Sequence, residues 1–138
     1  MDARDLLLPG FAMAALTMLV MFRMGFERLS QLARERIHPQ AVATSAQMSA
    51  RLKDSRAADN FRNLFELPVL FYLALLVGVN QDLASPLTVG LAWAFVGLRV
   101  AHSAIHCSYN KVPHRFAVYA LGALVLWTLW GVLLAGVL

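Results

Sequence analysis

The sequence predicts an all-α integral membrane protein, a single domain over residues 1–138 in which four transmembrane helices form a bundle. The chain is 59% apolar and only 14% charged, with a mean hydropathy of +0.62, whereas about a quarter of the residues of soluble domains are charged. Four apolar stretches are each long enough for the roughly 20 residues that a membrane helix needs. The lysines and arginines gather mainly between these stretches.

The first predicted span covers residues 6–26. Its leading residues include two carboxylates and lack the basic character of a signal peptide, so we expect this segment to be retained. Residues 27–58 form a polar and basic loop. The start of this loop, GFERLSQLARERI, should continue the first helix beyond the membrane surface, and Pro39 should stop it, because a residue before proline is disfavoured in helical conformation.

The second predicted span covers residues 61–79 and begins amphipathic, with Asp54 or Ser55 as candidate N-caps. Pro68 should bend it, because the proline ring removes one backbone hydrogen bond. A short turn without lysine or arginine leads to the third span, residues 87–107. A second short turn leads to the fourth, residues 116–138, which carries no charge.

The distribution of basic residues predicts the topology. The two loops that hold most of them should lie in the cytoplasm, and four spans then place both termini on the non-cytoplasmic side. The basic residues of the cytoplasmic loops explain the net charge of +4. The predicted partner is therefore the lipid bilayer, and no nucleic acid is expected. The chain has one cysteine, Cys107, so no intrachain disulfide can form.

Polar residues within the spans are the candidates for function, because an ionisable group at membrane depth is costly unless it is paired or faces a wet cavity. All of them fall at the predicted cytoplasmic ends of the spans, so we expect them to meet in one polar pocket. Two sets share a helix face by spacing. The candidates are Arg23; Asn60; Asp59, Asn63 and Glu66 at i, i+4 and i+7; Arg99, His102 and His106 at i, i+3 and i+7; and Arg115 and Tyr119.

Other interpretations of these residues stay open. Arginines near span ends can extend to headgroups, an asparagine can join helices, and histidines can be neutral interior groups. A metal site is a further alternative, since His102 and His106 at i, i+4 could join Glu66, and Cys107 or His114, as zinc-type ligands. The spacing is common on helices, so no metal site is predicted.

Two motifs resemble the MAPEG family, the membrane-associated proteins in eicosanoid and glutathione metabolism. The first is Arg62-Asn63-Leu64-Phe65-Glu66, similar to the family's Asn-x-x-Glu with a preceding arginine. The second is Arg99-Val-Ala-His102, followed by Pro113, Arg115 and Tyr119. The resemblance covers the whole chain and implies a homotrimer that holds glutathione between neighbouring subunits.

The resemblance also implies a function: a glutathione-dependent transferase or peroxidase that acts on lipophilic small molecules. It implies that Arg115 stabilises the thiolate, while the peptide is held by Arg62, Asn63 and Glu66 in a pocket lined by His102. The remaining expected binding residues are Arg23, Arg99, His106 and Tyr119.

The sequence departs from the family pattern at three positions. Asp59 stands where the family commonly has arginine, Phe61 where many members have histidine, and His106 where many have tyrosine. The carboxylate of Asp59 in place of a cation keeps an alternative open, a non-enzymatic membrane protein with the same fold.

Overall fold

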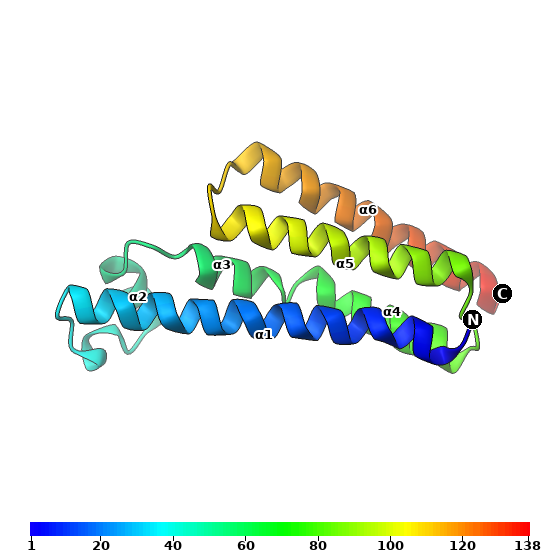
Figure 1. Ribbon diagram of the computed structural model, residues 1–138, viewed down its shortest axis with the longest axis horizontal. Helices are drawn as coiled ribbons and strands as arrows, with labels where there is room; N and C mark the ends of the chain where they lie inside the picture. The colour runs from blue at the N-terminus through cyan, green and yellow to red at the C-terminus, as the bar shows by residue number, and fades with distance from the viewer.

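Four helical segments of the computed structural model, which describes residues 1–138, are long and apolar enough to cross a membrane. They confirm the predicted all-α fold with four apolar spans. In Figure 1 the two termini lie together at one end of an elongated bundle, as an even number of crossings requires. The segments are α1 (Ala3–Arg34), α3 and α4 taken together (Arg56–Asn63 and Leu67–Asn80), α5 (Pro86–Cys107) and α6 (Val112–Val137).

Helix α1 runs the full length of the bundle. Its 32 residues span about 48 Å, whereas the hydrocarbon core of a bilayer is about 30 Å thick. The helix is therefore longer than this core is thick, and it ends at Arg34, ahead of Pro39, as predicted. The following segment holds a short 3₁₀ helix (Pro39–Val42) and α2 (Ser45–Arg51).

The second span is broken rather than bent. Helix α3 ends at Asn63, α4 begins at Leu67, and only tight-turn hydrogen bonds link Phe65 to Arg62 and Glu66 to Asn63. Pro68 lies in the first turn of α4, where its ring would clash with the carbonyl of Leu64 if the helix were continuous. The predicted face of Asp59, Asn63 and Glu66 is therefore wrong at Glu66, which lies outside both helices.

The core lies between α1, α4, α5 and α6. Helix α1 contributes Leu6, Met13 and Val20 at seven-residue intervals, which is the spacing of one buried helix face. Phe71 of α4 stacks on Phe95 of α5 with ring centroids 4.6 Å apart. This packing aligns α5 against the broken span, so the polar residues of both helices lie towards the same end of the bundle.

Candidate functional site

Arg99 is the most deeply buried charged side chain of the bundle. It lies on α5 and is only 1% exposed. Its guanidinium carbon lies 5.2 Å from the ring centroid of Phe95 and 4.9 Å from that of Tyr119 on α6. Neither Nη1 nor Nη2 has a hydrogen-bond partner. A buried cation without a hydrogen-bonded ion-pair partner is costly, so this guanidinium is suited to bind an anionic group.

Two histidines continue the same buried face of α5. His102 and His106 are both buried, and their ring centroids lie 5.6 Å apart. The ring of His102 also lies 5.9 Å from that of Tyr119. Both ring nitrogens of His102 and Nδ1 of His106 lack partners. The structure thus brings together four of the predicted residues: Arg99, His102, His106 and Tyr119. The first three have side-chain nitrogens without a hydrogen-bond partner.

Asn60, one of the polar residues expected to converge but not one of the expected binding residues, joins α3 to this face. Its side chain is fully buried. Its Oδ1 accepts a hydrogen bond from Ser103 Oγ at 3.3 Å, and its Nδ2 contacts Cys107 Sγ at 3.5 Å. The spacing of Ala57, Asn60 and Leu64 at i, i+3 and i+7 places them on one face of a helix, and the structure shows that all three are buried.

The motif residues of the second span do not join this cluster. Arg62 has a side chain that is 74% exposed and meets only Asp59, at 3.7 Å. It lines an open groove between α1 and α3 with Met24 and Arg28. Glu66 is exposed, and Asn63 donates to the backbone carbonyl of Asp59 in its own helix at 3.2 Å. Glu66, expected to face the other polar residues inside the bundle, is exposed on the single chain, although its carboxylate still interacts with the charge of Arg99. The role of Arg62, which the family resemblance implies, stays a prediction.

Arg115 begins α6 and is half-buried. Its Nη1 donates to Oδ1 of Asn110 at 2.6 Å, a residue of the turn between α5 and α6. The backbone of Asn110 is left-handed, with φ of 50°, a conformation that asparagine tolerates better than most residues. The direction of the Arg115 side chain is thus set by the shape of this turn.

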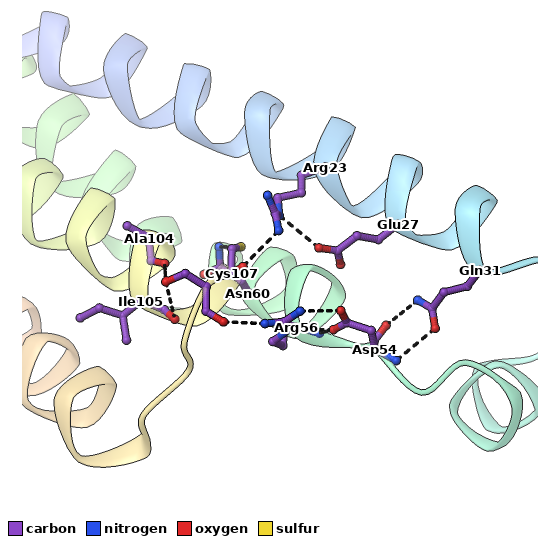
Figure 2. Close-up of polar contacts among 10 residues, drawn as sticks. Arg23, Glu27, Gln31, Asp54, Arg56, Asn60, Ala104, Ile105 and Cys107 are labelled. Carbon is purple, nitrogen blue, oxygen red and sulfur yellow. Dashed lines mark hydrogen bonds and ion pairs between the residues drawn. The ribbon is translucent and has the colours of Figure 1, made fainter. Parts of the chain in front are cut away.

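A polar network closes the end of α5 (Figure 2). Arg23 of α1 pairs with Glu27 at 3.1 Å and donates to the carbonyl of Cys107 at 3.1 Å. Arg56 donates to the carbonyl of Ser108. The last carbonyls of a helix have no partner within the helix, so these two arginines satisfy them. Arg23, expected as a ligand contact, serves as a cap of α5 here.

Asp54 orients Arg56 in this network. The Arg56 guanidinium donates from Nη2 to Oδ2 at 2.7 Å and from Nε to Oδ1 at 2.9 Å, a two-bond geometry that favours the ionised carboxylate. These bonds lower the pKa of Asp54 from 3.8 to about 2. The backbone of Asp54 exchanges two hydrogen bonds with the side chain of buried Gln31 on α1, at 2.9 and 3.1 Å.

The metal-site alternative finds no support. No three side chains of histidine, cysteine, aspartate or glutamate are grouped so that they could hold a metal ion. The ring of His102 lies beside the rings of His106 and Tyr119.

Comparison with known proteins gives one match. A family model described as the MAPEG family matches residues 6–135 of the 138-residue chain. No curated protein matches the chain, and no solved structure does. The matched range takes in nearly all of α1 and α6 and every helix between them.

Proposed function

The chain belongs to the MAPEG family of membrane-associated proteins in eicosanoid and glutathione metabolism, and from that premise we propose that it is an integral membrane enzyme that uses glutathione to conjugate or reduce lipophilic electrophiles. The observation that carries this proposal is the buried, unpartnered guanidinium of Arg99. Glutathione has two carboxylates, and pairing one of them with this cation would remove the cost of leaving the cation buried alone.

The binding side of the site is formed by α5 and α6. His102 and His106 offer unpartnered ring nitrogens beside Arg99, and they can donate to or accept from the peptide groups of glutathione. The ring of Tyr119 covers the guanidinium, so the ligand has to displace this ring to reach it. Tyr119 then becomes a contact at the edge of the site.

The chemical step depends on a thiolate. A free thiol has a pKa near 8.5 and is mostly protonated at neutral pH, and a neighbouring cation favours the ionised form. The guanidinium of Arg115 supplies this cation and is held by Asn110. The thiolate sulfur attacks the electrophilic carbon, an S–C bond forms, and the leaving group departs with its electron pair. Lipophilic substrates would reach the sulfur from the bilayer.

The homotrimer is part of the same proposal. Arg62 and Glu66 are exposed on the single chain and Asn63 is half-buried, so they would reach glutathione from a neighbouring subunit and not from within one chain. This arrangement would reconcile the surface position of the second-span motif with a role in binding.

Titration of glutathione into the purified full-length protein in detergent tests the proposal. The wild type should bind saturably and show thiolate absorbance. Arg99→Gln should weaken binding by about tenfold or more, the loss expected for a hydrogen-bonded charge pair. Arg115→Gln should retain binding and lose the thiolate and the conjugation of a general electrophile.

Arg34→Gln is the matched control, since Arg34 is exposed and bonds only a carbonyl of its own helix. It should behave as the wild type. The proposal is rejected if the wild type shows neither thiolate nor conjugation, or if Arg115→Gln is indistinguishable from it.

A non-enzymatic protein of the same fold is the second candidate. The observation that favours it is Asp59, whose carboxylate on α3 lies 3.7 Å from Arg62 and offsets the positive charge there. This candidate predicts a stable trimer by native mass spectrometry together with no glutathione binding at millimolar concentration.

A further inference from the structure

The end of α5 is held by two arginines, each of which is oriented by a carboxylate. Glu27 orients Arg23 on the carbonyl of Cys107, and Asp54 orients Arg56 on the carbonyl of Ser108. Cations are favourable near the C-terminus of a helix. Figure 2 shows both arginines reaching α5 from the side of α1 and α3, so the position of this helix end is fixed from outside the α5–α6 hairpin.

The turn behind this helix end carries the partner of Arg115. Residues 108–111 join α5 to α6. Ser108 at the start of the turn is bound by Arg56, and Asn110, two residues later, accepts from Arg115. The N–H of Asn110 also bonds the carbonyl of Ile105 at 2.9 Å. One short hydrogen-bonded turn therefore connects the Asp54–Arg56 pair to the guanidinium of Arg115.

We propose that the Asp54–Arg56 pair is a positioning device for Arg115: it fixes the turn through Ser108, and the turn fixes Arg115 through Asn110. The inference rests on the proposed function, in which Arg115 stabilises the thiolate. Neither Asp54 nor Arg56 touches the reacting atoms. Their contribution is to hold one guanidinium where the charge on sulfur develops.

The geometry favours positioning over simple stabilisation of the fold. The side chains of Arg56 and Asp54 are 41% and 35% exposed, and ion pairs at such exposure add little to folding stability. The pair is nevertheless constrained on three sides: the two-bond fork, the bonds between Gln31 and the backbone of Asp54, and the carbonyl of Ser108. A small misplacement of a charged group can cost a large factor in rate.

The experiment compares four variants of the full-length protein in detergent. Arg56→Gln and Asp54→Asn break the pair. Arg56→Lys keeps the charge but loses the planar fork. Arg51→Gln is the control, because Arg51 is an exposed arginine of the same segment with no hydrogen bond or ion pair. Amide hydrogen exchange over residues 108–115 reports the turn, and the pH profile of conjugation reports the bound thiol.

In Arg56→Gln and Asp54→Asn, exchange in the turn should accelerate by about tenfold or more, as expected for the loss of a bond to a charged group. The apparent pKa of bound glutathione should rise by about one unit, which is a tenfold loss of thiolate. The dissociation constant of glutathione should change by less than about threefold, because Arg99 is untouched. Arg56→Lys should give partial recovery, and Arg51→Gln should change nothing.

The outcomes distinguish the proposed enzymatic function from the positioning role of the Asp54–Arg56 pair. Faster exchange in the broken-pair variants of a protein whose wild type shows no glutathione chemistry would keep the structural link and reject the enzyme. Unchanged exchange, or an unchanged pH profile in an active enzyme, would overturn the positioning role. Loss of binding and rate together, with an equal fall in thermal stability, would also overturn it in favour of a purely structural pair.

Discussion

The ring of Tyr119 lies over the guanidinium of Arg99, 4.9 Å from its carbon, and the two residues come from different helices, α6 and α5. A cation beside an aromatic face gains about 0.5–2 kcal/mol, which is much less than the cost of burying a cation without hydrogen bonds. The buried charge of Arg99 therefore lowers the folding stability of the ligand-free protein.

Arg99→Met should stabilise the ligand-free protein. Methionine is unbranched and is the apolar side chain closest to arginine in length, and replacing buried ionic groups by apolar side chains of similar volume is often stabilising. Phe95 and Tyr119 already supply apolar surroundings. Thermal unfolding in detergent without glutathione measures the effect. Under the proposed function, the same variant should no longer be stabilised by added glutathione. A large loss of stability in the ligand-free state would show that Arg99 has a partner within the fold.

Asn60→Ala should destabilise the protein by about 2–3 kcal/mol, because it leaves the hydroxyl of buried Ser103 unpaired and opens space between α3 and α5. Asn63→Ala is the matched control. Its side chain bonds only a carbonyl of its own helix, so the cost should stay below about 1 kcal/mol. Denaturation of both variants under one condition checks the difference, and equal costs would contradict the inward position of Asn60.

The contact between Asp54 and Arg56 should be sensitive to acid. The folded-state pKa of Asp54, about 2, is lower than its ordinary value of 3.8, so its contribution to stability is fully present above the ordinary value and is lost as the pH falls towards 2. Arg56 and Arg23 are the cations that lower this pKa. The pair is partly exposed, so the stability advantage of the wild type over Asp54→Asn is small. Measured by thermal unfolding, this advantage should shrink between about pH 5 and pH 2. An advantage that stays constant over this range would refute the assignment.

Much of the fold is predictable from the sequence because each membrane span is a long apolar stretch. An error of a few residues in a predicted boundary does not change the number or the order of the spans. The buried face of α5 is predictable for the same kind of reason: Arg99, His102 and His106 recur at helical spacing on an uninterrupted helix. The spacing of residues is sufficient to predict the buried face of a helix wherever that helix is continuous.

The candidate site is less predictable where a helix is interrupted. Pro68 interrupts the second span, and its effect on Glu66 depends on whether the helix bends or ends, which local sequence does not decide. Contacts such as Arg56 with Ser108 join residues 52 positions apart. They arise from the packing of α1, α3 and α5, and no spacing rule in the chain indicates them.

Because both termini lie at the same end of the bundle (Figure 1), consecutive copies could be encoded as one polypeptide through linkers that never have to cross the bilayer. Such a concatemer would allow Arg99 or Arg115 to be altered in one unit at a time. Glutathione binding by concatemers with one, two or three altered units would then show how many intact units each bound glutathione requires. No mixing of purified subunits would be needed.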